Sequence, residues 1–289
     1  MVWVNAVLQG AMLGGLYALF ACGLSLMFGV MRVVNLAHGD LSVLAAYGSV
    51  AIFDSFGWNP FVTLLVVVPG MALVGAVMQR LVLERSLRIG PLAPLLATFG
   101  LSIALENLLL QIFSPDPRIL PIGSFGISSW QLTNQLSISW FALLTLGVAV
   151  VVLIGIEMFL KRTKTGQAMR ATSDDPSTAE LMGIDARWIY TVAAVIAMAT
   201  VAVAGVFLGM RTTFTPSSGP DYLIFAFEAV VIGGIGSVRG TLVGGILLGI
   251  AQTVGAQINT ADPVLAGDLF FLAVMVLRPR GLFRSSVLA

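Results

Sequence analysis

Long apolar stretches alternate with short polar connections along the whole chain. The stretches cover about residues 3–31, 37–53, 58–83, 92–113, 138–160, 188–210, 223–236, 241–257 and 264–277. A helix crosses the hydrocarbon core of a bilayer with about 20 residues, so most of these stretches are long enough to span it. None alternates strictly between apolar and polar positions, which favours helices over a membrane β-barrel. The pattern predicts an all-α, polytopic membrane bundle of about 8–9 transmembrane segments, forming a single domain over residues 1–289.

The number of segments depends on two regions with short or broken helices. Glycines crowd the chain from Gly233 to Gly249, between and within two short stretches. These stretches could form two short spans joined on the inner side at 237–240, or a re-entrant pair that enters and leaves on the outer side. The first two stretches, joined through MRVVNLAHGD, carry a milder form of the same ambiguity. Short, glycine-broken segments can mark a transport pathway, or they can simply allow close helix packing.

Glycines spaced four residues apart predict tight packing between helices. The sequence contains four such GxxxG patterns, at Gly10 and Gly14, Gly205 and Gly209, Gly240 and Gly244, and Gly245 and Gly249. Small residues at this spacing form a groove on one helix face, where a second backbone can approach. The spacing does not identify the partner helix.

The composition excludes several classes of protein. Hydrophobic residues make up 58% of the chain and charged residues only 10%, whereas a soluble domain carries about 25% charged residues. A soluble enzyme, a nucleic-acid binder and a disordered protein are therefore excluded. The single cysteine, Cys22, excludes a disulfide framework. The N-terminus has no basic segment before its apolar run and is interpreted as a first membrane helix rather than a cleaved signal peptide.

The distribution of lysine and arginine predicts the orientation. With the loop at 161–187 placed in the cytoplasm and the segments alternating outward from it, thirteen basic residues lie inside. These are Arg32, Arg80, Arg85, Arg88, Lys161, Arg162, Lys164, Arg170, Arg187, Arg239, Arg278, Arg280 and Arg284. Only Arg118 and Arg211 lie outside. The positive-inside rule then places the N-terminus outside, the loop at 114–137 outside and the C-terminus inside.

The sequence lacks the residue sets that an enzyme needs. It contains one histidine, His38, and one cysteine, Cys22, and no GxSxG, HExxH or GxxxxGK[ST] motif. We therefore expect no catalytic residues and no metal site. Without a phosphate-binding loop, the chain cannot hydrolyse ATP by itself.

The largest cytoplasmic loop, 161–187, contains a predicted short helix. Asp175 is a helix N-cap residue, Pro176 suits the first helical position, and Gly183 suits the position that ends a helix. Ala179, Glu180, Leu181 and Met182 lie between these boundaries. Leu181 and Met182 would place apolar side chains on a cytoplasmic surface. The helix could dock into a groove on a partner, or it could fold back onto its own bundle.

Four segments of the chain resemble a known family. They are GQAMRATSDDPSTAELMGIDARWIYTVAAVIAMATVAVAGVFLGM, GLSLMFGVMRVVNLAHGDLSVLAAYGS, FEAVVIGGIGSVRGTLVGGILLGI and VLRPRGLF. Their order and content resemble LivH-type permeases, which are membrane subunits of bacterial ABC importers for branched-chain amino acids. The resemblance extends over nearly the whole chain.

The resemblance implies partners and a role for the loop. Residues 176–183 match the coupling helix, which in ABC importers sits in a cleft of an ATPase subunit, and Glu180 and Gly183 match its motif. ATP and magnesium would then bind to two separate ATPase subunits, and this chain would bind no cofactor. A homologous second permease and a periplasmic substrate-binding protein complete the expected complex in the bacterial inner membrane, without nucleic acid.

Polar residues inside apolar stretches are candidates for a substrate pathway. Glu106 and Asn107 lie in the stretch 92–113, and Glu228 lies in 223–236. An ionised carboxylate facing lipid costs about 2.5 kcal/mol or more, so each should face a helix interface or a water-filled path. Asn35 and His38 would share a face if they were helical. Each of these residues could instead make a structural hydrogen bond.

The sequence thus predicts the transmembrane permease of an ABC importer for branched-chain or related amino acids. Two alternatives remain open at this point. The same machinery could carry urea or short amides, because permeases for those substrates are similar. The chain could also be an ion-coupled secondary transporter or channel, which would need no ATPase-docking helix.

Overall fold

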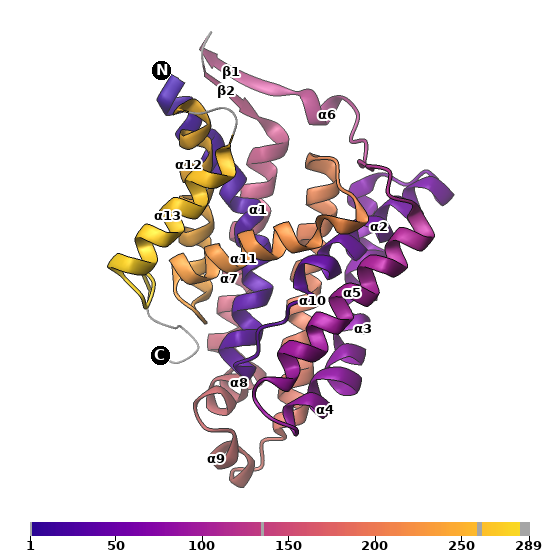
Figure 1. Ribbon diagram of the computed structural model, residues 1–289, viewed down its shortest axis with the longest axis vertical. Coiled ribbons are helices and arrows are strands. Elements are labelled where there is room, and N and C mark those ends of the chain that lie inside the picture. Colours follow the sequence, from indigo (N-terminus) through magenta and orange to yellow (C-terminus); the bar gives the residue numbers. More distant parts are fainter. Residues whose placement is uncertain (1, 134–135, 259–261, 284–289) are drawn as a thin grey trace.

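The computed structural model describes residues 2–133, 136–258 and 262–283, and the described part is a helical bundle with one small hairpin (Figure 1). Met1, Arg284 and Ala289, for which the sequence predicts a side of the membrane, lie outside the described residues. The strands β1 (Ser129–Thr133) and β2 (Leu136–Ser139) are antiparallel, and they start within the loop at 114–137 and end just beyond it. The sequence analysis did not predict this hairpin.

All nine apolar stretches form helices. In chain order, the helices are α1 (Val2–Met31), α2 (His38–Phe56), α3 (Pro60–Met78), the π-helix η1 (Gln79–Leu83), α4 (Glu84–Leu87), α5 (Ala93–Phe113), α6 (Ser124–Ile127), α7 (Trp140–Arg162), α8 (Lys164–Asp174), α9 (Pro176–Leu181), α10 (Ala186–Arg211), the 3-10 turn η2 (Pro216–Ser218), α11 (Gly219–Gly233), α12 (Val238–Ile258) and α13 (Pro263–Leu277). Within the described ranges, six helical segments are long and apolar enough to cross a membrane, namely α1, α3 with its continuation to Leu87, α5, α7, α10 and α12. The all-α, multi-pass architecture is therefore confirmed.

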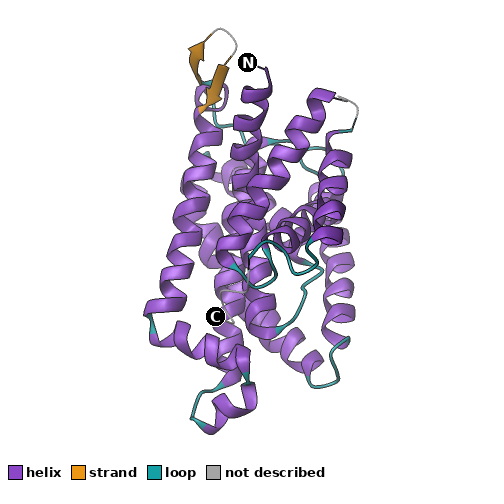
Figure 2. Cartoon of the chain, turned by 90° about the vertical axis from the view of Figure 1, so that its left-hand side faces the viewer, coloured by secondary structure: helices purple, strands orange, loops and turns teal. Residues whose placement is uncertain are grey.

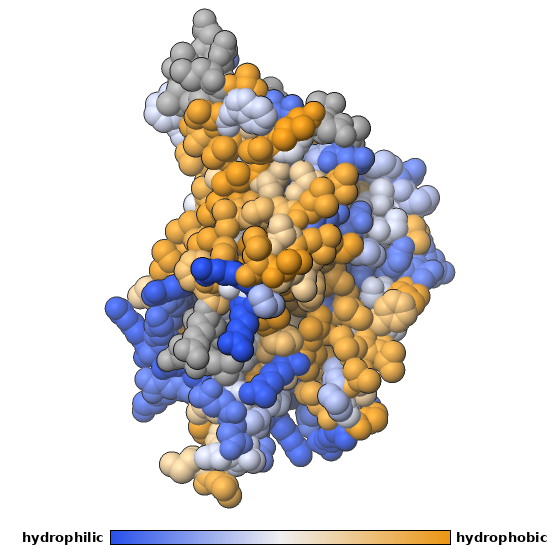
Figure 3. Space-filling model, turned by 60° about the vertical axis from the view of Figure 1, so that its left-hand side comes forward, coloured by the Kyte–Doolittle hydropathy of each residue, from blue (hydrophilic) through white to orange (hydrophobic). Residues whose placement is uncertain are grey.

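The bundle has two distinct ends. The start of α1 and the β1–β2 hairpin lie at one end, and α8 and α9 project from the other (Figures 1 and 2). We call these the hairpin end and the loop end. Figure 3 shows apolar side chains over the middle of the molecule and hydrophilic ones gathered towards the loop end. This is the surface expected of a protein with a lipid-facing belt.

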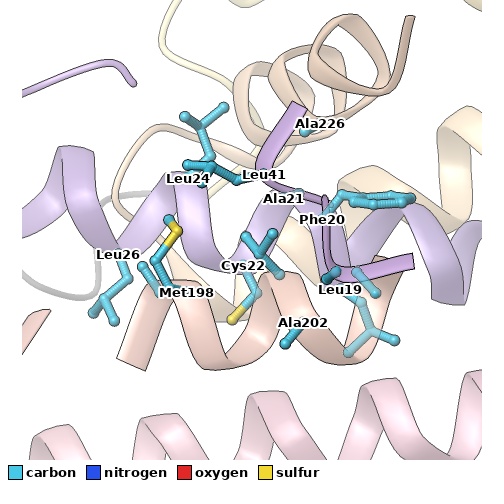
Figure 4. Close-up of a cluster of buried hydrophobic side chains, with 14 of the residues drawn as sticks. Leu19, Phe20, Ala21, Cys22, Leu24, Leu26, Leu41, Met198, Ala202 and Ala226 are labelled. Carbon is cyan, nitrogen blue, oxygen red and sulfur yellow. The ribbon is translucent and has the colours of Figure 1, made fainter. Parts of the chain in front are cut away.

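Helices α1 and α10 form the centre of the bundle. Their most apolar windows are 89% and 72% buried, against 11% for α5 on the outside. Figure 4 shows Leu19 and Cys22 of α1 among Met198 and Ala202 of α10. Many of the buried positions of α10 are alanines, which allow the two central helices to approach closely.

The GxxxG patterns lock α1 against α12. A Cβ atom on Gly14 would overlap the backbone of Gly245, and one on Gly249 would overlap the carbonyl of Gly10. Backbone therefore contacts backbone along two turns of each helix. The predicted tight packing is confirmed, and the structure identifies α12 as the partner of α1.

Two segments turn back into the bundle and start a new helix inside it. After α1 ends at Met31, residues 32–37 return towards the middle, and His38 begins α2 beside Phe20 of α1. After α10 ends at Arg211, residues 212–218 also return, and Gly219 begins α11. The starts of α2 and α11 meet there, with the carbonyl of Gly219 against Gly39. Paired broken helices of this kind are typical of transporters.

This arrangement corrects one expectation and decides between two alternatives. Asn35 and His38 do not share a helical face, because Arg32 adopts a left-handed backbone (φ 55°) that ends α1, and Asn35 lies in the connecting loop. Helices α11 and α12 are joined at the loop end, where Arg239 pairs with Glu157 near the end of α7 at 2.5 Å. The structure therefore supports two segments joined at 237–240 rather than a pair that re-enters from the opposite side.

Candidate functional site

The predicted helix at 176–183 exists, and Asp175 caps its start. One carboxylate oxygen of Asp175 accepts hydrogen bonds from the backbone N–H groups of Ser177 (3.0 Å) and Thr178 (3.2 Å). The hydroxyl of Ser177 (2.7 Å) donates to the same oxygen, and that of Thr178 (2.6 Å) donates to the other. These four bonds hold the pKa of Asp175 at about 2, below its ordinary value. Together with Pro176 at the first position, they fix where α9 begins.

The end of α9 is fixed by a Schellman motif. The N–H of Gly183 bonds to the carbonyl of Glu180 at 3.0 Å, and the N–H of Ile184 bonds to that of Ala179 at 3.1 Å. This pairing requires a left-handed residue at position 183, and Gly183 has φ 83°. The sequence-based boundaries of the helix are confirmed.

The apolar side chains of α9 point away from the protein. Leu181 is 87% exposed and Met182 is 79% exposed, whereas Ala179 is buried against the bundle. Figure 3 shows an apolar tip at the lowest point of the molecule, the level at which Figure 1 places α9. Of the two interpretations of Leu181 and Met182, the structure supports an outward-facing surface rather than one folded back onto the bundle.

The loop is firmly attached to the membrane helices. Helix α8, which the sequence analysis missed, follows α7 directly, and the Thr163 hydroxyl caps its start by accepting from the N–H of Gly166 at 3.0 Å. Gly166 packs against the backbone of Leu160 in α7. The Arg32 guanidinium, just beyond α1, donates to the carbonyl of Ser173 at 3.3 Å. Through α8, the α9 helix is therefore linked to α7 and to the segment that follows α1.

Two of the candidate pathway residues have structural roles. The Asn35 side chain accepts from the N–H of Ala37 at 3.1 Å and stabilises the turn before α2. His38 is fully buried, and its Nε2 lies 2.9 Å from the carbonyl oxygen of Phe20. Both side chains hold the returning connection at residues 32–37 and the start of α2 in place. His38 lies deep in the bundle rather than at its interface with water.

The acidic candidates fall in three different places. Glu106 is half-buried and lies near Asp40 of α2, whose carboxylate accepts from the Ser102 hydroxyl on α5. Asn107, its neighbour in sequence, is exposed on the outer face of α5 and donates to the carbonyl of Ile103. Glu228 of α11 is buried and lies beside the carboxyl group of Asp268 on α13. The structure does not gather these residues into one site.

A cavity of about 390 Å³ lies between α1, α10, α11, α12 and α13. Its wall is mostly aromatic and aliphatic. The rings of Tyr17 and Phe225 have centroids 5.0 Å apart, and the Tyr17 hydroxyl donates to Oε1 of Gln252 at 2.5 Å. Arg211, the last residue of α10, supplies a positive charge to the lining. The volume is in the range of small-molecule sites.

The sequence analysis missed this cavity as a site. Its lining comes from five helices that are far apart in the chain, so no local motif could reveal it. One indication was present, because Arg211 is one of only two basic residues on the predicted outer side. A basic residue at the end of an apolar stretch that carries few other charges is a candidate for binding.

A family model described as the permease component of a branched-chain amino acid transport system matches residues 6–278. The chain belongs to this family. The permease is 31% identical to BraD, a high-affinity branched-chain amino acid transport system permease protein of Pseudomonas aeruginosa, over 97% of this chain and 95% of BraD. It is 27% identical to LivH of Escherichia coli K12, a permease protein of the same description, over the same shares of the two chains. The resemblance to LivH-type permeases is therefore confirmed.

The permease also shares its fold with a solved structure. A chain from the structure titled PsaBC from Streptococcus pneumoniae in complex with Fab superposes with a TM-score of 0.51. The match covers 96% of this permease and 92% of that chain at 18% sequence identity. At this identity the similarity establishes the fold alone. Together, the family and the apolar helices establish a multi-pass membrane transport protein rather than an enzyme.

Proposed function

We propose that this permease forms the membrane pathway of an ABC importer for branched-chain or related amino acids. Its α9 helix docks into an ATPase subunit, and a periplasmic binding protein delivers the cargo at the hairpin end. A homologous second permease and two ATPase subunits, which bind ATP and magnesium, complete the complex in the bacterial inner membrane. The observation that carries this proposal is the family match over residues 6–278.

The geometry of α9 supports the coupling role. Helices of about two turns are not stable alone in water, yet α9 is held by a cap at each end and presents two exposed apolar side chains. A groove on a partner protein binds exposed apolar side chains of this kind when the helix that carries them is held in a fixed position. Glu180 lies on the same short helix and is exposed, so it is available to pair with a basic residue of the partner.

The charge distribution supports an inward-facing loop end. The ion pair of Arg187 with Glu84 (3.5 Å) and that of Lys161 with Glu157 (2.7 Å) lie near α8 and α9. Arg118, one of the two basic residues predicted outside, lies at the opposite end, where it approaches Asp54 at 4.0 Å. With the positive-inside rule, this arrangement supports our proposal that α9 lies in the cytoplasm and the hairpin in the periplasm.

Co-expression of the permease with its ATPase subunits tests the proposal. Leu181→Lys should weaken co-purification of the ATPase subunits and reduce ATP-driven leucine uptake, because a charge replaces the apolar docking group. Ile89→Lys is the matched control, since Ile89 is 81% exposed in the connection between α4 and α5 and lies outside α9. Normal assembly and uptake with Leu181→Lys would contradict the docking role.

The same reconstituted system tests the two alternatives. ATP-independent uptake driven by an ion gradient would identify a secondary transporter or channel. Uptake of urea or a short amide, with no uptake of leucine, isoleucine or valine, would keep the ATPase-driven mechanism and change the cargo.

A further inference from the structure

The guanidinium of Arg211 lies on an apolar cavity wall without a protein counter-ion. Within the described ranges, no carboxylate lies within ion-pair distance of Arg211, and its side chain makes no hydrogen bond there. The residue is half-buried and contributes to the same wall as Tyr17 and Phe225. We propose that the cavity is a binding subsite for an α-amino acid with an apolar side chain, and that Arg211 binds its carboxylate. This inference rests on the proposed function and assigns the residues that hold its cargo.

The chemistry of arginine favours a carboxylate as the missing partner. Its planar guanidinium presents paired N–H groups that match the two oxygens of a carboxylate. An unpaired charge on a largely apolar wall is energetically costly. A ligand that supplies the opposite charge removes this cost and therefore binds more tightly. A neutral ligand such as urea would leave the charge of Arg211 uncompensated.

The rest of the lining suits the other parts of an apolar amino acid. Leu13, Leu16 and Val264 offer an aliphatic surface for a branched side chain. The aromatic faces of Tyr17, Tyr222 and Phe225 attract a cation, and the ammonium group of the ligand can lie against them. The hydrogen of the Tyr17 hydroxyl is engaged by Gln252, so its oxygen remains an acceptor for the same ammonium group. The cavity thus complements a zwitterion with an apolar tail.

The position of the cavity fits a subsite on the way in. Arg211 ends α10, and Val264 lies in the first turn of α13 beside the end of α12, so the cavity lies towards the hairpin end. This is the end that the proposed orientation exposes to the periplasm. An amino acid released by the binding protein would meet Arg211 before it reached the buried starts of α2 and α11.

Cysteine protection measures occupancy of the cavity directly. Val264→Cys places a thiol on the lining, and the native Cys22 is fully buried, so it gives little background labelling. In the complete complex, L-leucine should slow maleimide labelling at position 264. Leucinamide lacks the carboxylate and should protect much less, and so should glycine, which lacks the apolar side chain. Equal protection by leucine and leucinamide would overturn the role of Arg211.

Substitution of Arg211 is the second part of the protection experiment. Arg211→Gln should raise the half-protecting concentration of leucine by about tenfold or more, because the charge partner is lost. Arg211→Lys keeps the charge and should retain part of the protection. Arg118→Gln removes the other basic residue of the hairpin end and should change nothing. Unchanged protection in Arg211→Gln would overturn the proposal, and if that variant fails to assemble, the comparison of leucine with leucinamide decides it.

Uptake by the unsubstituted complex separates this inference from the proposed function. If the complex imports leucine but leucine does not protect position 264, the function stands and the subsite is wrong. If the complex imports no amino acid, the proposed function itself fails.

Discussion

The carbonyl of Gly219 lies against Gly39, so the starts of α11 and α2 touch backbone to backbone in the middle of the bundle. Two helix N-termini at one place concentrate partial positive charge there. Asp40, on the first turn of α2, lies between them, and its carboxylate also lies against Gly219. The burial of this acidic residue is explained by the two helix dipoles that it offsets.

The contact predicts that neither glycine can be enlarged. A Cβ atom at Gly39 or Gly219 would overlap backbone or the Asp40 side chain, which cannot move away easily. Gly39→Ala and Gly219→Ala should each lower the free energy of unfolding by about 1–3 kcal/mol. Thermal unfolding in detergent measures the effect. Gly147→Ala in α7 is the control, because a Cβ there meets no atom within 4 Å, and its unfolding temperature should not fall.

The end of α9 predicts a selective loss of coupling. Gly183→Val forces a β-branched residue into a left-handed backbone, at a local cost of about 1–3 kcal/mol. A Cβ at this position meets nothing within 4 Å, so the bundle should still fold. Substrate-stimulated ATP hydrolysis should drop sharply. Asparagine tolerates the left-handed region, so Gly183→Asn should retain most of the activity. Equal activity of the Val and wild-type proteins would exclude a role for this turn.

The cap of α9 predicts a defined dependence on pH. The pKa of Asp175 is lowered to about 2, so its cap is fully effective above the ordinary pKa of an aspartate and is lost as the pH falls through about 2. Asp175→Ala should abolish this contribution at every pH and increase hydrogen exchange of the amides of Ser177 and Thr178. Asp174→Ala, one residue earlier, should leave that exchange unchanged. Faster exchange in both variants would show that the effect is not specific to the cap.

The proposed orientation predicts the accessibility of two exposed positions. Ser129→Cys in β1 should react with an impermeant thiol reagent added outside spheroplasts, and Met182→Cys should react only after lysis. Both side chains are exposed, whereas Cys22 is buried and serves as an internal blank. External labelling at position 182 would reverse the topology and remove α9 from the cytoplasm.

Local chemistry made the helices and the α9 boundaries predictable. Apolar length identifies a membrane helix, and the bonds that begin and end α9 are made by residues within it or beside it, such as Asp175 and Gly183. The return of residues 32–37 into the bundle was not predictable in this way. It depends on contacts with distant residues, such as the bond from the N–H of Leu36 to the hydroxyl of Thr98 at 3.1 Å.

The candidate site was only partly predictable for the same reason. Polar residues within apolar stretches were the predicted candidates. In the structure, the Asn35 side chain bonds within its own turn, and His38 bonds to the carbonyl of Phe20 in α1. Asn107 lies on an outer face. Arg211 and Gln252 belong to one cavity only because α10 and α12 pack around α1. No spacing along the sequence encodes that proximity.

The glycine contacts between α1 and α12 limit how the cavity can change shape. Tyr17 and Gln252 belong to these two helices and are hydrogen-bonded to each other, so they form one stiff wall. Tyr222 belongs to α11, which also packs backbone to backbone against α12, at Gly233 and Gly244. Val264 belongs to α13, whose closest contacts with the glycines of this interface are made through side chains, those of Gln252 and Ala266. A change in the width of the cavity is therefore expected to come from movement of α13, while α1, α11 and α12 keep their relative positions.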